Sequence, residues 1–245
     1  MPHKEYIREV ENSENAYLFI HGIIGSPDHF KKLIELIPSN SSVYNILLDG
    51  HGEKIKDFAK SSMKKWESQV EDMLIYLNCK YKNIIIVGHS MGTLLAINIA
   101  LKYPEKIKKL FLLSVPVKVA VKSTAVSDEV KLFFGRIGTN DITANAAIEE
   151  HSIEQEKYLF KYLSLIPRYI ELFLKINETD KKLSQLTTPA IAFQSEKDEY
   201  VSPKSYKFLK EYPIFETILL KNSYHNYYTQ EDFQIIKERF NEIIL

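Results

Sequence analysis

Short runs of apolar residues alternate along the chain with longer segments whose apolar positions recur every three or four residues. The short runs predict strands, and the longer segments predict amphipathic helices. We expect strands at 17–20, 42–48, 83–87, 107–114, 190–194 and 215–220. We expect helices at 27–37, 64–80, 91–103 and 230–244, and one more that opens with Ser202 and Pro203. Such alternation is typical of an α/β fold, a mostly parallel sheet flanked by helices.

The alternation stops between residues 116 and 183, where the pattern is helical and contains no convincing strand. We interpret residues 1–115 and 184–245 as one core domain. Residues 116–183 would then form a small helical cap, inserted after the strand that precedes them. The cap is rich in aromatic residues, from which we select Phe133, Phe134 and Phe160 as candidates for substrate binding. The alternative, that these rings only pack the cap against the core, stays open because a cap must pack as well as bind.

Composition places the chain among ordinary globular proteins and argues against two kinds of partner. Its 245 residues are 45% hydrophobic and 26% charged. Lys and Arg together number 32, as do Asp and Glu, so the chain lacks the excess of positive charge that nucleic-acid binding requires. The uncharged run 83–101 could be mistaken for a membrane span, but two glycines, His89, Ser90 and Asn98 interrupt it. A buried strand that leads into a buried helix explains this run better.

The remaining compositional signals concern cysteine, metals and location. Cys79 is the only cysteine, so it cannot form an internal disulfide, and we expect it on a helix near the surface. No CxxC or HExxH spacing predicts a metal site. Residues 1–15 contain no apolar run of signal-peptide length, and we therefore expect a cytoplasmic location.

The sharpest chemical signal is a GxSxG motif, Gly88-His89-Ser90-Met91-Gly92, between an apolar strand and an apolar helix. In this setting a strand turns abruptly into a helix and exposes the serine hydroxyl at the carboxyl end of the strand. Glycine at both flanks removes the Cβ atoms that such a turn would crowd. We therefore predict that Ser90 is a catalytic nucleophile.

A serine nucleophile needs an imidazole to accept its proton and a carboxylate to orient that imidazole. In proteins with this strand–serine–helix motif, the acid and then the base follow the serine along the chain. Of the seven histidines, only His225 lies after the last expected strand. Asp198 follows the strand 190–194 after a short turn, and we select it as the acid, with Glu196 and Glu199 as solvated charges. The strand before the cap is followed by no carboxylate that could act instead.

The negatively charged oxygen of a tetrahedral intermediate needs backbone N–H donors that are already in place. The loop 21–25, with the sequence HGIIG, follows the first expected strand, and we predict the amides of Ile23 and Met91 as the two donors. We expect His21 to hold this loop through hydrogen bonds. The segment 49–52, with the sequence DGHG, is expected to shape a neighbouring loop because two glycines indicate special backbone angles.

The HGIIG, DGHG and GHSMG segments, the late Asp198 and the final His225 together resemble the α/β-hydrolase superfamily, and within it the bacterial carboxylesterase and monoacylglycerol lipase branch. The resemblance extends over essentially the whole chain, although His89 stands where that branch often has Leu. It implies cofactor-free hydrolysis of a small-molecule ester with a short to medium acyl chain, through an acyl-enzyme intermediate. Another reaction of the same triad, such as that of a thioesterase, an acyltransferase or a C–C bond hydrolase, is the alternative.

Overall fold

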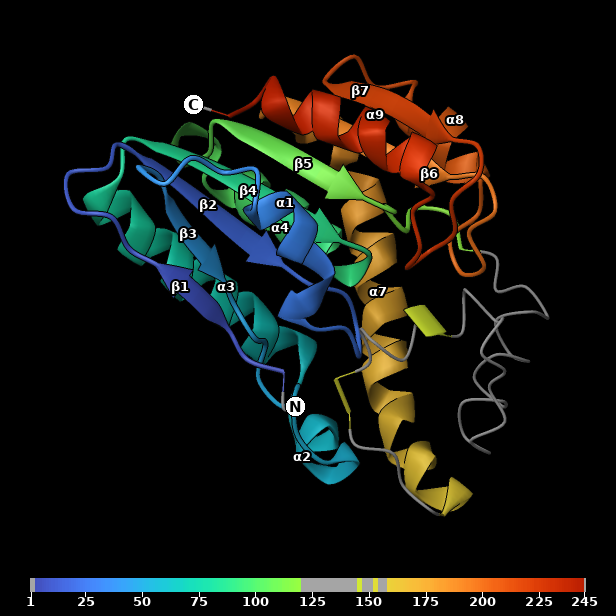
Figure 1. The fold of residues 1–245 in the computed structure, drawn as a ribbon. Coiled ribbons are helices and arrows are strands. Elements are labelled where there is room, and N and C mark those ends of the chain that lie inside the picture. The colour runs from blue at the N-terminus through green and yellow to red at the C-terminus, as the bar shows by residue number, and fades with distance from the viewer. Residues whose placement is uncertain (1–2, 120–144, 147–151, 154–157, 245) are drawn as a thin grey trace.

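The computed structural model describes residues 3–119, 145–146, 152–153 and 158–244 (Figure 1). Its centre is a seven-stranded sheet in the order β1-β3-β2-β4-β5-β6-β7, in which only β1 runs antiparallel to its neighbour. The strands are β1 (Tyr6–Arg8), β2 (Asn15–Ile20), β3 (Ser42–Asn45), β4 (Asn83–His89), β5 (Lys109–Leu113), β6 (Ala190–Ser195) and β7 (Phe215–Leu220). The six parallel strands therefore end at one common edge of the sheet.

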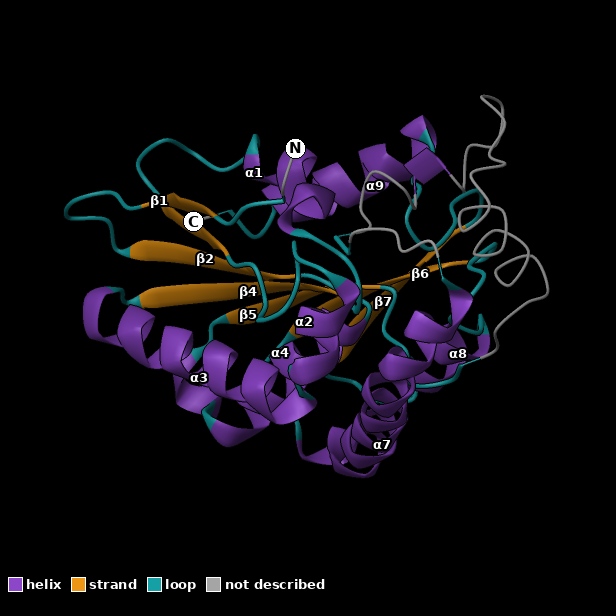
Figure 2. Cartoon of the chain, turned by 90° about the horizontal axis from the view of Figure 1, so that it is seen from below, coloured by secondary structure: helices purple, strands orange, loops and turns teal. Residues whose placement is uncertain are grey.

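Helices cover both faces of the sheet. The α-helices are α1 (Lys31–Ile34), α2 (Ile55–Lys60), α3 (Met63–Lys80), α4 (Met91–Lys102), α7 (Ile166–Lys182), α8 (Lys204–Leu209) and α9 (Gln230–Asn241). Short 3₁₀ helices span Pro27–Phe30, Pro104–Lys106, Leu159–Leu165 and Leu183–Gln185. Figure 2 shows α1 and α9 on one side of the strands and α3, α4, α7 and α8 on the other. This is the α/β fold with a mostly parallel sheet that the sequence predicts.

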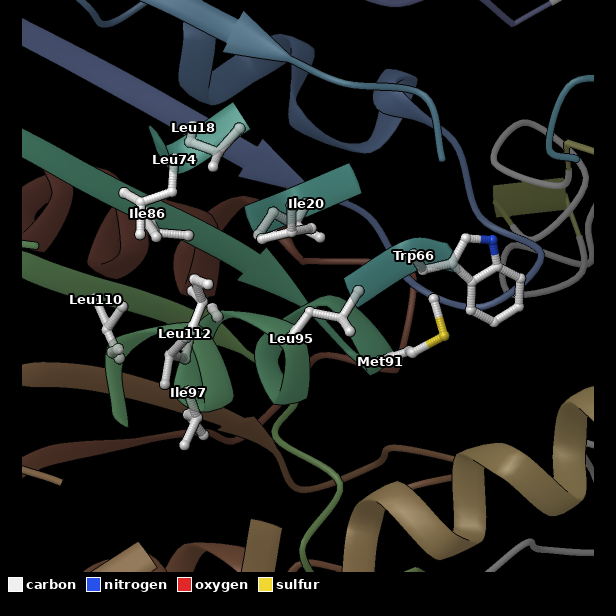
Figure 3. Close-up of a cluster of buried hydrophobic side chains, with 14 of the residues drawn as sticks. Leu18, Ile20, Trp66, Leu74, Ile86, Met91, Leu95, Ile97, Leu110 and Leu112 are labelled. Carbon is white, nitrogen blue, oxygen red and sulfur yellow. The ribbon is translucent and has the colours of Figure 1, made fainter. Parts of the chain in front are cut away.

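The sheet has a hydrophobic core on each face because successive residues of a strand point to opposite sides. In β4, Ile84 and Ile86 belong to the core shared with α3 and α4, and Ile85 and Val87 belong to the core shared with α1 and α9. The first of these cores includes the fully buried Trp66 and several side chains of α4 (Figure 3). Burial on both faces explains why the central strands read as continuous apolar runs.

All six expected strands are present. The structure differs from the expectation in one additional edge strand and in one divided helix. β1 was not expected, because it is only three residues long and two of them, Tyr6 and Ile7, are exposed at the edge of the sheet. The expected helix 27–37 is divided into a 3₁₀ helix and the short α1. Cys79 lies on α3 and is exposed, as expected. The uncharged run 83–101 forms β4 and most of α4, and no helix among the described residues is long and apolar enough to cross a membrane.

The described end of the predicted cap is helical and packs on the core. Asn98 of α4 donates a hydrogen bond to the Thr179 hydroxyl of α7 at 2.6 Å. Arg168, at the other end of α7, donates to the carbonyl of Ala59 just inside α2 at 2.7 Å. The boundaries 116–183 stay a prediction, since most residues between 120 and 157 lie outside the described part of the chain.

Candidate active site

Ser90 occupies a tight turn between β4 and α4, with the backbone angles φ 50° and ψ −120°. The two flanking glycines are required by close packing. A Cβ on Gly92 would lie 2.0 Å from the carbonyl oxygen of Ile20, and one on Gly88 would lie 2.8 Å from the carbonyl oxygen of Gly92. The amide of Ser90 donates a hydrogen bond to the carbonyl of Leu113 at 2.9 Å, which ties the turn to β5. The turn at Ser90 can therefore pack against β2 only because both flanking residues of the GxSxG motif are glycine.

The three residues predicted to act together lie within hydrogen-bond distance of one another. His225 Nε2 is 3.1 Å from Ser90 Oγ, and His225 Nδ1 is 2.8 Å from Asp198 Oδ2. Because Asp198 can only accept when it is ionised, the imidazole proton lies on Nδ1 and Nε2 is left to accept the serine hydroxyl proton. Ser90 follows β4, Asp198 follows β6, and His225 lies between β7 and α9, so the common edge of the sheet brings the three loops together.

The Asp198 side chain is completely buried and yet is held in its charged form. Burial by itself would raise the pKa of this carboxyl, but the charge and hydrogen bond of His225 and two backbone amides together lower the pKa below its usual value. Those amides, from Tyr200 and Val201, donate to Asp198 Oδ1 at 2.9 and 2.8 Å. The carboxylate is therefore fixed in the orientation that His225 requires.

Two further side chains reach the main chain of His225. Glu199, which we expected to be a solvated charge, is only 7% exposed, and its Oε2 accepts the amide proton of His225 at 3.0 Å. That expectation was wrong because the loop after β7 folds over Glu199, which nothing in its own segment indicates. Glu196 is exposed, as expected. His89 is buried, and its Nε2 donates to the carbonyl oxygen of His225 at 3.1 Å.

The loop after β2 is shaped by His21, as the sequence suggested. Its Nδ1 donates to the carbonyl of Gly22 at 2.9 Å, and its Nε2 accepts the amide proton of Leu48 at 3.1 Å. Burial lowers the pKa of His21 from its usual 6.5 to about 4, so the ring is neutral near pH 7. In the neighbouring DGHG segment both glycines have positive φ, 78° for Gly50 and 74° for Gly52.

A largely apolar cavity opens beside Ser90 and His225, with a space of about 950 Å³ when its open mouth is included. One wall is formed by four residues of α7, which we call the α7 wall: Tyr169, Leu172, Phe173 and Ile176. Other apolar parts of its lining are Ile23, Ile24, Pro116, Val119 and Val201. The α7 wall was missed at the level of sequence, although its spacing of three, four and seven residues is the signal of one helix face.

The aromatic residues selected from the cap do not form the described wall. Phe160 is 66% exposed on the 3₁₀ helix before α7, where its ring lies 5.8 Å from that of Tyr158, and it is not part of the cavity lining. Phe160 is therefore outside the described lining of the cavity, and its part in substrate binding stays a prediction. Phe133 and Phe134 lie outside the described residues.

Comparison with known proteins identifies the family. The sequence profile described as serine aminopeptidase S33 matches residues 11–232, which is most of the chain. The chain belongs to this family. It is 25% identical over 239 residues to a thermostable monoacylglycerol lipase of Bacillus sp. (strain H-257), and the match covers 94% of this chain and 90% of that protein.

Solved structures share the fold of this S33 family member. One, from work on two metagenome-derived lipolytic enzymes, LipS and LipT, has a TM-score of 0.75 at 20% identity, with 99% of this chain and 97% of the other covered. Another, a monoacylglycerol lipase of Paleococcus ferrophilus, has a TM-score of 0.71 at 16% identity, with 98% of each chain covered. The α/β-hydrolase fold expected from the sequence is thereby confirmed.

The two backbone amides predicted to bind an oxyanion belong to segments beside Ser90, and their role stays a prediction. Met91 is the first residue of α4, and the first amides of a helix have no partner within the helix. Ile23 borders the cavity, and a Cβ on its neighbour Gly22 would lie 3.1 Å from Ser90 Cβ. Within the described ranges, no three His, Cys, Asp or Glu side chains are arranged to hold a metal ion.

Proposed function

We propose that this protein is a serine hydrolase of carboxylic esters with short to medium acyl chains, similar to a carboxylesterase or a monoacylglycerol lipase. The observation that carries the proposal is the hydrogen-bonded series from Ser90 Oγ through His225 to Asp198, with distances of 3.1 and 2.8 Å, at the base of an apolar cavity. This arrangement can deprotonate a hydroxyl at the moment it attacks a carbonyl carbon.

In the proposed reaction, Ser90 Oγ attacks the ester carbonyl while His225 Nε2 accepts its proton. The amides of Ile23 and Met91 bind the oxygen that becomes negative. His225 then gives the proton to the departing alcohol, which leaves an acyl group on Ser90. A water molecule activated by His225 releases the acid and restores the hydroxyl, while Asp198 stabilises the imidazolium in both halves of the reaction.

The lining of the cavity favours an ester over the peptide that the family description names. No Asp or Glu is among the described residues that line it, whereas a free peptide N-terminus carries a positive charge that needs a carboxylate. The α7 wall instead offers apolar surface to an acyl chain, at about 0.8 kcal/mol for each buried CH₂ group. The monoacylglycerol lipase of Bacillus sp. and the lipolytic enzymes of similar fold support the same choice.

The decisive experiment replaces the nucleophile. We expect Ser90→Ala to fold normally and to lose hydrolysis of p-nitrophenyl esters by about four or more orders of magnitude. A fluorophosphonate should label Ser90, as mapped by mass spectrometry. Ser114→Ala is a control, because Ser114 follows the neighbouring strand β5 with a similar positive φ of 56° but is not part of the cavity lining. Near-normal turnover by Ser90→Ala, or labelling of another serine, would contradict the proposal.

A further inference from the structure

His225 lies in a segment that is neither helix nor strand, between the end of β7 at Leu220 and the start of α9 at Gln230. Such a segment has no ladder of backbone hydrogen bonds to fix its position. Catalysis by the proposed triad nevertheless depends on the distance between His225 Nε2 and Ser90 Oγ, and an error of about 1 Å can cost about 100-fold in rate. The position of this backbone must therefore be set by contacts from elsewhere in the molecule.

Both polar groups of the His225 main chain are bound by buried side chains. Glu199 accepts the His225 N–H at 3.0 Å, and the His89 Nε2–H donates to the His225 C=O at 3.1 Å. Each of these side chains is the neighbour in sequence of another member of the proposed triad. His89 precedes Ser90, and Glu199 follows Asp198. Any displacement of the His225 backbone relative to the nucleophile or the acid would therefore strain one of these two bonds.

We propose that His89 and Glu199 are positioning residues, which clamp the main chain of His225 from both sides, with Glu199 acting as an ionised carboxylate. This inference rests on the proposed function, because it assigns the two residues to the same triad. Neither side chain is required by the chemistry of the triad itself, and neither needs to touch the substrate.

The protonation of His89 agrees with its proposed role. To donate to a carbonyl, Nε2 must carry the proton, and a neutral ring with the proton there is sufficient. Burial lowers the pKa of His89 well below its usual range, and the neighbouring His29 and His225 lower it further. The His29 ring stacks on His89 with centroids 3.8 Å apart and an angle of 22° between the planes. The ring that holds the carbonyl is thus neutral and fixed in orientation.

The charge of Glu199 adds a measurable consequence. Burial holds the pKa of Glu199 above its usual value, and the nearby charge of Asp198 also raises this pKa, while the hydrogen bond from the His225 amide acts in the opposite direction. The groups that face His225 are then Asp198, Glu199, the Ser90 hydroxyl and the rings of His89 and Tyr200. In the proposed clamp two of these groups, Asp198 and Glu199, are anions, and both stabilise the imidazolium relative to the neutral imidazole.

Two substitutions of Glu199 separate its shape from its charge. Glu199→Gln keeps an oxygen that accepts the amide proton, so we expect kcat near pH 8 to stay within about threefold of the parent. Because an anion beside the imidazole is removed, the acid limb of kcat/KM should shift to lower pH by about half a unit or more. Glu199→Leu removes the acceptor, so kcat should fall by about 10- to 100-fold with little change in KM. Glu196→Gln and Glu196→Leu, at an exposed neighbouring position, serve as controls that should match the parent.

A second pair of variants tests the other side of the clamp. His89→Leu removes the donor to the His225 carbonyl, and we expect a loss in kcat comparable to that of Glu199→Leu. His89→Gln offers an amide N–H at a similar reach and should recover most of this loss. Because both side chains hold one backbone segment, the double variant Glu199→Leu with His89→Leu should lose less than the product of the single losses.

The readouts are kcat, KM, the pH profile of kcat/KM, the melting temperature and the rate of labelling by a fluorophosphonate. A parent that neither hydrolyses esters nor reacts with the probe would overturn the proposed function. An active parent whose Glu199→Leu and His89→Leu variants react at the parental rate would overturn the clamp alone. If a leucine variant does not fold, the glutamine variants still test the clamp. An acid limb of kcat/KM that does not shift in Glu199→Gln would overturn it, and so would a folded His89→Gln whose kcat is 10- to 100-fold below that of the parent.

Discussion

The base of the cavity and the α7 wall meet at the same space but are built in different ways. The base consists of loops that follow β2, β4, β6 and β7, and its polar side chains Asp198 and His225 are buried and hydrogen-bonded to each other. The α7 wall lies on a helix held at its ends by polar contacts, and its Phe173 is 48% exposed. The base can therefore tolerate little change without loss of the chemistry, whereas the wall can vary in shape and alter which substrate fits.

The largest effect is expected at the tightest point of the base. Gly92→Ala would place a methyl group 2.0 Å from the carbonyl oxygen of Ile20, so β2 and α4 would have to separate. We expect a loss of about 3 kcal/mol in the free energy of unfolding and a fall in melting temperature of about 6–12 °C, with esterase activity almost abolished. In Gly25→Ala, the nearest contact would be 3.2 Å, and the loss should be much smaller. An unchanged melting temperature in Gly92→Ala would show that the turn is looser than its packing indicates.

Low pH should destabilise the fold through the buried histidine His21, which lies at the base of the cavity. The pKa of His21 is about 4 in the folded protein and 6.5 in the unfolded chain. Between these two pH values the unfolded chain binds a proton on His21, whereas the folded protein leaves the ring neutral. Stability is therefore lost as the pH falls from about 6.5 to about 4, with about 2 kcal/mol lost by pH 5 from His21 alone.

Urea unfolding at pH 7.5 and pH 5 measures this difference. His21→Gln, which cannot be protonated in this range, should be less stable at pH 7.5 but should lose less between the two values. Phe173→Ala, on the α7 wall, should keep the parental dependence on pH because the wall contains no histidine. If His21→Gln and the parent lose equal stability, the acid sensitivity has another origin.

A smaller effect is expected where the loop of His225 is attached to α9. Ser223 is fully buried, and its hydroxyl donates to Asp232 Oδ2 at 2.7 Å and accepts the amide proton of Thr229 at 3.2 Å. Ser223→Ala removes the hydrogen bond to the Asp232 carboxylate and the one from the Thr229 amide, which should lower the free energy of unfolding by about 1–2 kcal/mol. Ser164→Ala, at an exposed position on the cap side, should stay within about 0.5 kcal/mol of the parent. Equal melting temperatures for Ser223→Ala and Ser164→Ala would show that the buried hydroxyl at the base of the cavity contributes no more stability than an exposed one on the cap.

The smallest effect concerns the α7 wall and appears in specificity. In the parent, kcat/KM should rise from acetyl esters toward intermediate acyl lengths, by up to about fourfold for each buried CH₂ group, and then fall where the cavity ends. Phe173→Ala lengthens the apolar space and should move the optimum to longer chains by one or more CH₂ groups, with little change in melting temperature.

Phe160→Ala is the matched control, because Phe160 is exposed and not part of the lining, and it should leave the optimum unchanged. Phe133→Ala and Phe134→Ala in the same screen test the earlier prediction for those two residues. A flat profile in the parent enzyme would contradict the pocket for an acyl chain, and an optimum moved by Phe160→Ala but not by Phe173→Ala would place the wall elsewhere.

The sequence alone determined the parts of this protein whose signals are local. Apolar runs located six strands because central strands are buried on both faces, and GxSxG located the turn at Ser90 because glycine alone fits beside β2. Asp198 and His225 could be selected by their order along the chain, since the carboxyl ends of parallel strands meet at one edge. Each of these features depends on a few neighbouring residues or on the order of the strands.

Only the tertiary structure decided the features that depend on which distant segment covers a residue. Glu199 stands among polar neighbours and has the pattern of a solvated charge, but the loop of His225 folds over it and supplies an N–H. The apolar face of α7 is visible in the sequence as a helical repeat, whereas its position beside Ser90 is not. Phe160 is as apolar as Phe173, yet Phe173 borders the cavity and Phe160 is not part of its described lining. Periodicity gives the face of an element that is apolar, and the packing of the whole chain determines what that face meets.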